Sequence, residues 1–237
     1  ADNGMIGITG TNARPSVAPT FGVENMLGTN PLTFGIPTDE EFPFVLDCAT
    51  SIIQRGKIEL YGRKNTPIPD GLVVGLDGKS RNDTQEILTD LTTGKAALNA
   101  LGGIGEVTGG HKGYGYSAVV EILSAALQNG SYLKMLSGIG QDGKKIPIPI
   151  GHFFIAINVS NFVPLEIFKK ISGSICRDLR NSKKAPATER IYTAGEKEHL
   201  SILERKEKGI PLTESLQNDI KTMVDELELK GYNFPFL

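Results

Sequence analysis

A lysine set among glycines is the residue whose surroundings best suit chemistry. Lys112 lies in a glycine-rich run from His111 to Gly115, and the apolar segment from Ser117 to Gln128 that follows is predicted to be a helix. Backbone amides at a helix start, flexible glycines and a nearby cation together favour an anion. The pattern therefore predicts an anion or cofactor site beside Lys112. The alternative is a plain helix cap with a solvated lysine.

Other polar side chains give less specific signals. Arg14 follows a Gly-Thr-Asn triplet in a long loop and could clamp a substrate carboxylate bidentately, or could simply be solvated. The three histidines, His111, His152 and His199, show no metal-ligand spacing. We expect His152 to be a satisfied core histidine and His199 to be solvated.

Two glycine patterns carry the letters of a dinucleotide-binding loop. The first, from Gly138 to Gly143, has a helical segment before it and a proline-rich segment after it, so a turn at Asp142-Gly143 explains it better. The second, from Gly113 to Ala118, precedes a helix but follows a loop rather than a strand, and no acid lies about 20 residues further on. A Rossmann fold is therefore not expected.

Several short motifs become specific when they are taken together, in order and at their spacing. They are Thr11-Asn12-Ala13-Arg14-Pro15, Ala18-Pro19, Gly28-Thr29-Asn30-Pro31-Leu32, Asp47-Cys48-Ala49-Thr50, Lys112-Gly113-Tyr114-Gly115 and Gly195-Glu196. With this motif set the chain resembles the non-Rossmann malate/L-lactate dehydrogenase family, which includes ureidoglycolate and L-sulfolactate dehydrogenases. The resemblance runs from Gly4 to near the C-terminus.

The resemblance implies hydride exchange between NAD or NADP and a small 2-hydroxy acid of the malate or L-lactate type, which becomes the 2-oxo acid. It also implies an L-sulfolactate dehydrogenase-like fold and a homodimer. By position, the family's cofactor contacts fall at Asn12, Ala13, Asp47, Cys48, Ala49, Lys112, Gly195 and Glu196. Arg14 is the candidate for the substrate carboxylate, although family members commonly carry Ser, Pro or Asp near this position.

The family's catalytic histidine and its carboxylate-binding arginine precede the first strand of this chain. The resemblance therefore suggests the C-terminal two-thirds of a longer dehydrogenase. Without a proton donor near the carbonyl oxygen, turnover falls by orders of magnitude while binding can survive. We expect this chain alone to bind nucleotide with little activity. The alternative function is a non-catalytic nucleotide-binding or dimerisation module.

The elements that would position these residues alternate between strands and helices. Strands are predicted at Met5 to Thr9, Leu32 to Ile36, Phe44 to Ala49 and, as a buried strand, Phe153 to Ile157. Helices are predicted for Ser51 to Gly62, where an extended form is the alternative, and in the apolar segment after Lys112, which should be buried on nearly every face. Three amphipathic helices follow, at Leu165 to Asn181, Glu196 to Lys208 and Thr213 to Leu229, with Thr213 as an N-cap.

This tally favours an α/β fold, a layered mixed sheet with helices on its faces. Residues 1–160 would form the cofactor-binding core, including the long loop from Gly10 to Pro31, and residues 161–237 a helical part that packs back on it. A loop of that length inside a compact domain is usually functional. The turn-rich stretch from Lys64 to Asp83 should cross the surface. Gly-Thr-Asn occurs twice, at residues 10–12 and 28–30, which does not establish a repeat.

The amino-acid composition limits the classes of binding partner that we expect. The 25 basic and 27 acidic residues give a net charge of −2, which argues against nucleic-acid binding and against a polybasic membrane surface. No apolar run approaches the ~18 residues of a membrane span, and no secretory signal is visible. Cys48 and Cys176 are expected to be buried, reduced thiols of a cytoplasmic protein. The 28 glycines, about 12% of the chain against a usual 7%, indicate many turns and close backbone approaches.

Overall fold

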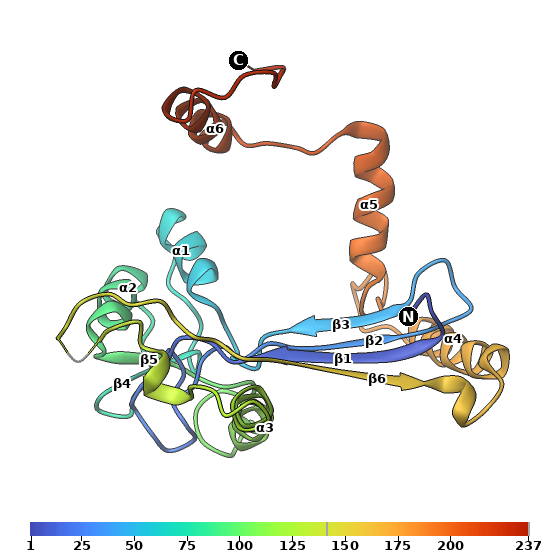
Figure 1. The fold of residues 1–237 in the computed structure, drawn as a ribbon, viewed down its shortest axis with the longest axis horizontal. Coiled ribbons are helices and arrows are strands. Elements are labelled where there is room, and N and C mark those ends of the chain that lie inside the picture. Colours follow the sequence, from blue (N-terminus) through green and yellow to red (C-terminus); the bar gives the residue numbers. More distant parts are fainter. Residues whose placement is uncertain (141, 237) are drawn as a thin grey trace. The chain divides into compact units, whose positions relative to one another are not determined.

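Four strands form the main sheet, in the order β3-β2-β1-β6 (Figure 1). Their bounds are Met5–Thr11 for β1, Leu32–Ile36 for β2, Phe44–Cys48 for β3 and His152–Asn158 for β6. All three neighbouring pairs are antiparallel, and Gly7 of β1 lies between Gly35 of β2 and Ala156 of β6. All four lie within two residues of their predicted ends. The expected α/β class is confirmed, and the sheet lacks the parallel pairing of a Rossmann fold.

The computed structural model describes residues 1–140 and 142–236, which form two compact units, Ala1–Gly195 and Glu196–Leu237. The division falls later than the expected boundary at 160 because helix α4, Leu165–Asn181, belongs to the first unit. Arg177 of α4 makes two hydrogen bonds to the Asp39 carboxylate, of 2.8 and 3.1 Å, in the turn between β2 and β3. The Ser172 hydroxyl donates to the Pro37 carbonyl at 2.6 Å. These bonds tie α4 to the sheet.

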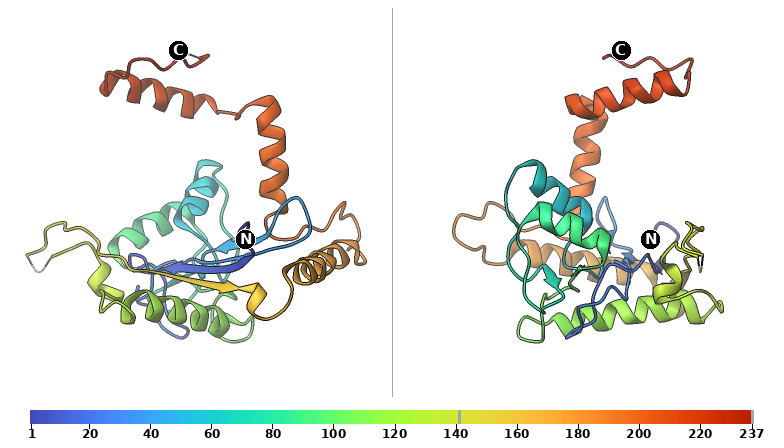
Figure 2. Two further views of the ribbon diagram at one scale, coloured as in Figure 1. Left: turned by 45° about the vertical axis from the view of Figure 1, so that its right-hand side comes forward. Right: turned by 90° about the vertical axis from the view of Figure 1, so that its left-hand side faces the viewer.

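Helix α3, Gly110–Ala126, lies across one face of the sheet against β1 and β6 (Figure 2). It begins seven residues earlier than the sequence predicts, so Lys112 lies inside its first turn. The expectation that α3 is buried on nearly every face is wrong. Val120 is fully buried, whereas Val119 is 49% and Ile122 is 60% exposed.

A smaller layer holds the main hydrophobic core of the first unit. It consists of α1 (Arg55–Arg63), α2 (Thr84–Thr93) and the two-stranded sheet of β4 (Val73–Gly75) and β5 (Ala96–Leu98). Ile58, Val73 and Ile87 are fully buried there. The helix predicted for Ser51 to Gly62 is thus confirmed as α1, which begins four residues later than predicted. The stretch from Lys64 to Asp83 does not simply cross the surface, because the apolar side chains of β4 belong to the core.

The long loop after β1 runs through this core instead of around it. Val17 and Leu27 bridge to one another across the loop, and both side chains are buried in the core. Val17 also forms a parallel bridge with Leu98 of β5. The loop is therefore held rigidly between the main sheet and the smaller layer, where its polar residues can build a site.

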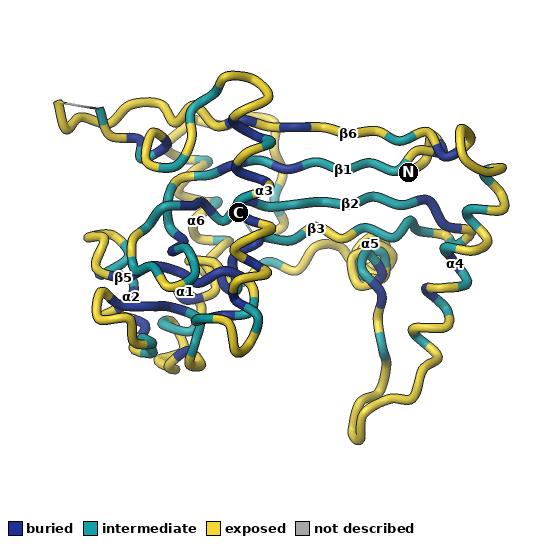
Figure 3. The backbone as a smooth tube through the Cα atoms, turned by 90° about the horizontal axis from the view of Figure 1, so that it is seen from below, coloured by how far each residue is buried: buried dark blue, intermediate teal, exposed yellow. Residues whose placement is uncertain are grey.

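The strand at the edge of the sheet is more exposed than predicted. Phe153 of β6 is buried, but Phe154 is 80% and Ile155 is 42% exposed (Figure 3). β6 has a hydrogen-bonded neighbour on one side alone, because the sheet ends there. The predicted strand is present at these residues, but the prediction that it is buried is wrong. His152, the first residue of β6, is likewise exposed and is not a core histidine.

The second unit holds α5, Glu196–Lys208, and α6, Glu214–Glu226, both confirmed as predicted helices. The Thr213 hydroxyl caps α6 by accepting from the Leu216 amide. Two short 3-10 turns, η1 (Leu133–Leu136) and η2 (Val159–Asn161), complete the described elements. No helix in residues 1–140 or 142–236 combines the length and the apolar character needed to cross a bilayer.

Candidate functional site

Asn30 joins the segments that the motifs single out. Its residue is fully buried, and its Oδ1 accepts a hydrogen bond from the Ala13 amide at 3.1 Å. Its Nδ2 donates to Glu121 Oε2 at 2.8 Å and to the Ser117 carbonyl at 3.1 Å, both on α3. Its backbone carbonyl accepts from the Thr50 hydroxyl at 2.9 Å. One asparagine thus links the loop at Ala13, the end of β3 and the middle of α3.

Asn12 is equally buried, and its side chain is used inside the protein. Its Oδ1 accepts from the Gly151 amide at 2.8 Å, and its Nδ2 donates to the Ser131 carbonyl at 3.1 Å and to Glu121 Oε1 at 3.5 Å. A fully buried amide with these partners fixes the loop. The neighbouring Ala13 is half-buried, and Arg14 is exposed.

The segment from Asp47 to Ala49 leaves the end of β3 beside this network. The Thr33 hydroxyl donates to Asp47 Oδ1 at 2.8 Å across the β2–β3 pair. Burial, together with the charge of Asp47, raises the pKa of the Cys48 thiol, so the thiol stays protonated at neutral pH and is a poor nucleophile. Cys48 is half-buried, less than expected, whereas Cys176 is buried as predicted, and both are free thiols. Thr50, just beyond, is hydrogen-bonded through its amide to the Thr29 carbonyl at 2.9 Å.

Lys112 reaches the same network through the packing of its helix. The carbonyl of Thr50 accepts from the Leu101 amide at 2.9 Å, and the backbone of Leu101 lies against Gly113 so closely that a Cβ there would fall 2.2 Å from the Leu101 carbonyl oxygen. Lys112 itself is exposed, and no carboxylate among residues 1–140 and 142–236 forms an ion pair with it. The first turn of α3 contains no acidic residue. Its helix start therefore keeps its positive potential.

Gly195 lies beside the beginning of β3. The Val45 amide donates to the Ala194 carbonyl at 3.3 Å, and Gly195 has φ +89° beside the backbone of Pro43 and Val45. Val45 and Cys48 are three residues apart on one strand, which corresponds to about 10 Å. The structure therefore joins Asn12, Ala13 and the segment 47–49 to the helix of Lys112, while Gly195 lies near the other end of β3. Glu196 opens the second unit.

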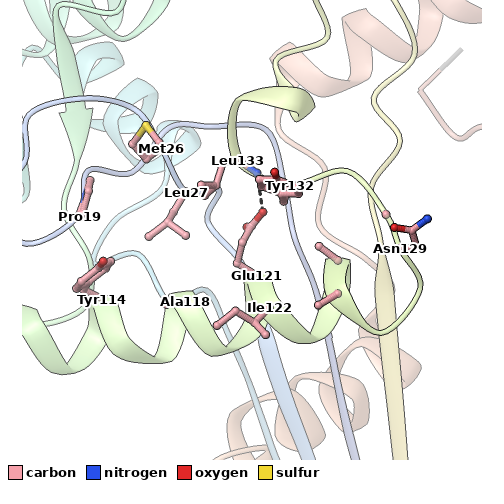
Figure 4. A pocket seen from close by; sticks show the side chains of 13 residues that line it. Pro19, Met26, Leu27, Tyr114, Ala118, Glu121, Ile122, Asn129, Tyr132 and Leu133 are labelled. Carbon is pink, nitrogen blue, oxygen red and sulfur yellow. Dashed lines mark hydrogen bonds between the residues drawn. The ribbon is translucent and has the colours of Figure 1, made fainter.

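Two cavities adjoin this network. One, of about 710 Å³, is lined by Ala13, Arg14, Thr29, Arg55 and Lys134 among others. The other, of about 620 Å³, is largely apolar and lies along α3, where Glu121 brings a carboxylate to its wall (Figure 4). Arg14 thus lines a cavity together with Ala13, which is the placement that a carboxylate or phosphate ligand requires.

The donor groups of this region suit an anionic ligand. No cluster of three or more His, Cys, Asp or Glu side chains that could hold a metal ion occurs in the part of the chain that the structure describes. The groups present are the unpaired Lys112 at a helix start, the backbone around Ala13 and close glycine contacts. A Cβ at Gly28 would lie 2.4 Å from the Ala13 carbonyl oxygen, so the loop keeps this shape through a glycine. Phosphate oxygens are the ligands that cations and helix starts favour.

Sequence comparison decides the family. Residues 1–221 match the family described as malate/L-lactate dehydrogenase. The chain belongs to this family. Malate dehydrogenase from Pyrococcus horikoshii is 38% identical over 231 residues, which are 98% of this chain and 61% of that protein.

Solved structures give the same family. The crystal structure of malate dehydrogenase from Entamoeba histolytica matches with a TM-score of 0.90 and 44% identity, over 99% of this chain and 64% of that one. Sulfolactate dehydrogenase from Methanocaldococcus jannaschii matches with a TM-score of 0.76 and 33% identity, over 96% and 61%. The family resemblance and the fold are confirmed, and the chain spans about three-fifths of the length of these relatives.

Three residues of the network, Asn30, Thr50 and Glu121, were not singled out from the sequence as site residues. Sequence signals point to two of them, Asn30 and Glu121. The repeated Gly-Thr-Asn triplet places Asn12 and Asn30 against the same carboxylate, and Glu121 is the single charged residue between Ser117 and Gln128.

Proposed function

We propose that this chain binds NAD or NADP and forms the cofactor-binding part of an oxidoreductase that interconverts a 2-hydroxy acid of the malate or L-lactate type and its 2-oxo acid. The observation that carries the proposal is the hydrogen-bonded network that joins Ala13, Thr50, which directly follows the segment from Asp47 to Ala49, and the helix of Lys112. Membership of the malate/L-lactate dehydrogenase family supports it.

The residues of the chain would divide the binding work. Lys112 and the start of α3 supply positive charge for phosphate oxygens, because neither is neutralised by a described carboxylate. The backbone at Ala13 is held by Asn30, and Arg14 lines the adjoining cavity as the candidate for the substrate carboxylate. The nicotinamide, when bound, accepts or donates the hydride.

We further propose that two copies of the chain associate. The resemblance implies a homodimer, and exposed apolar side chains on β6 and α3, such as Phe154, Val119 and Ile122, are typical of a surface that is covered in an assembly. Sedimentation velocity measures the mass directly. A monomer over the full micromolar range contradicts this part of the proposal.

The decisive experiment measures binding and turnover separately on the 237-residue chain. NADH and NADPH binding is followed by the change in their fluorescence, and oxidation of malate and of L-lactate by the absorbance of the reduced nicotinamide. Binding with little turnover is the expected result, since the resemblance places the catalytic histidine ahead of the first strand. If the folded chain binds neither cofactor, the proposal is wrong.

A further inference from the structure

One buried carboxylate holds the loop on which the proposed cofactor site depends. Glu121 lies in the middle of α3 and is 5% exposed. Its Oε2 accepts from Asn30 Nδ2 at 2.8 Å, and its Oε1 accepts from Asn12 Nδ2 at 3.5 Å. Oε1 also accepts from the Leu133 amide at 2.8 Å (Figure 4). All three partners are N–H donors. A buried acidic side chain with donors alone around it acts as a fixed acceptor.

Two of these partners hold an uncommon backbone conformation. Asn30 has φ +36° and Leu133 has φ +47°, in the left-handed region that side chains other than glycine rarely adopt. Leu133 has a branched side chain and no polar group to satisfy its own backbone. Such conformations persist where the surroundings impose them, and they concentrate at functional sites. Here the Glu121 carboxylate accepts a hydrogen bond from both residues, from the Asn30 side chain and from the Leu133 backbone amide.

The effect of Glu121 extends to the candidate site through Asn30. The Asn30 amide group is oriented by giving its Nδ2 hydrogens to Glu121 and to the Ser117 carbonyl, which leaves its Oδ1 for the Ala13 amide. Reversing this amide would place two N–H donors against one another at Ala13. The carboxylate and the Ser117 carbonyl together therefore select the orientation of Asn30, and that orientation sets the backbone at Ala13 beside Arg14.

We propose that Glu121 is a positioning residue for cofactor binding, acting through the Asn30 side chain on the Ala13 backbone. The inference rests on the proposed function, because it assigns a consequence for cofactor affinity to a residue outside the proposed cofactor contacts. It is distinct from a purely structural role, in which Glu121 would stabilise the fold without altering the affinity of the folded protein.

Exchanging donor and acceptor in the hydrogen bond between Asn30 and Glu121 distinguishes the positioning role from the purely structural role. In Glu121→Gln, the Gln oxygen can still accept from Leu133 and Asn12, but its NH₂ group faces Asn30 Nδ2, so two donors meet. Adding Asn30→Asp turns that pair into a donor and an acceptor, and the other Asp oxygen still accepts from Ala13. The double variant loses the bond to the Ser117 carbonyl and keeps one buried carboxyl group, as in the natural protein.

The experiment compares NADH affinity, by fluorescence titration, with the melting temperature for four proteins: the unaltered chain, Glu121→Gln, the double variant and the control Glu106→Gln. Glu106 is exposed and lies ahead of α3. We expect Glu121→Gln to bind NADH about tenfold more weakly, the size of effect of one disrupted hydrogen bond. The double variant should recover most of that affinity while its melting temperature stays low, and the control should match the unaltered chain.

The outcomes are distinguishable from failure of the proposed function. If the unaltered chain does not bind NADH or NADPH, the proposed function fails. If it binds, and folded Glu121→Gln binds equally well, Glu121 is structural and the positioning role is wrong. Should Glu121→Gln not fold, the double variant decides: recovered folding and affinity support the role, and a double variant that is unfolded or binds no NADH overturns it.

Discussion

Alanine at Gly113 would place a methyl group inside the backbone of Leu101. The added Cβ would lie 2.2 Å from the Leu101 carbonyl oxygen, 2.5 Å from its nitrogen and 2.7 Å from its Cα. Favourable contacts between nonbonded heavy atoms are about 3.5–4.0 Å, so α3 and the Leu101 segment must separate by more than ~1 Å. Backbone atoms cannot rotate out of the way as a flexible side chain can.

Gly115 offers a matched control two residues along the same helix. A Cβ there would meet nothing within 4 Å, and the residue is exposed. Both substitutions gain the helix propensity of alanine over glycine, about 1 kcal/mol. That gain cancels when the two variants are compared, so their difference in stability reports the overlap at Leu101. Overpacking costs typically about 1–3 kcal/mol and occasionally more, and three backbone overlaps place this case at about 3 kcal/mol.

Urea unfolding followed by far-ultraviolet circular dichroism measures this difference, because the chain has no tryptophan to report on tertiary structure. We expect Gly115→Ala to be slightly stabilised and Gly113→Ala to be destabilised relative to it by about 3 kcal/mol. For a chain of this length that corresponds to about 6–12 °C in the melting temperature. NADH affinity should fall in the same variant, since Leu101 is hydrogen-bonded to Thr50. Equal stability of the two alanine variants would refute the close approach of α3 to Leu101.

Three further predictions use the exposed cation, an ion pair and a helix cap. Lys112→Ala should weaken NADH binding about tenfold with an unchanged melting temperature, whereas Lys95→Ala, which removes another exposed lysine, should do neither. The hydrogen bond from Arg177 lowers the pKa of Asp39. The pair therefore stabilises the fold at pH values above the unfolded pKa of about 4, and this contribution is lost as the pH falls through the lowered pKa of the folded protein. A pH series of unfolding curves should show that the stability of Asp39→Asn depends less on acid than that of the unaltered chain. Asp83→Ala removes the acceptor of two amides in the first turn of α2 and should cost about 1 kcal/mol, or about 2–4 °C by thermal unfolding; an unchanged melting temperature contradicts the cap.

The secondary structure follows closely from local patterns. Helices α4 and α5 begin and end at the predicted residues, because their apolar side chains recur at helical spacing. Strand β2 also matches, since a short apolar run between turn residues leaves few alternatives. The predicted start of α3 is seven residues too late, because a run of glycines has low helix propensity. Its glycines are needed where Gly113 meets Leu101 and Gly110 meets the carbonyl of Gly103.

Burial was harder to predict than structure type. The apolar run of β6 has the composition of a central strand, yet β6 lies at the edge of the sheet and Phe154 is exposed. An edge strand has a hydrogen-bonded neighbour on one side only, and which strand lies at the edge depends on the order of the strands in space. For the same reason, the stretch that contains Val73 was expected on the surface, although it supplies a strand of the core.

The sequence by itself determined the family, the main helices and strands, and the presence of residue types suited to an anionic ligand. These depend on periodicity and on motifs whose residues lie close together along the chain. Only the tertiary structure decided which residues act together. Asn12, Asn30 and Glu121 are up to 109 residues apart in sequence and meet at one carboxylate, because a hydrogen bond depends on distance and direction in space and leaves no fixed spacing along the chain.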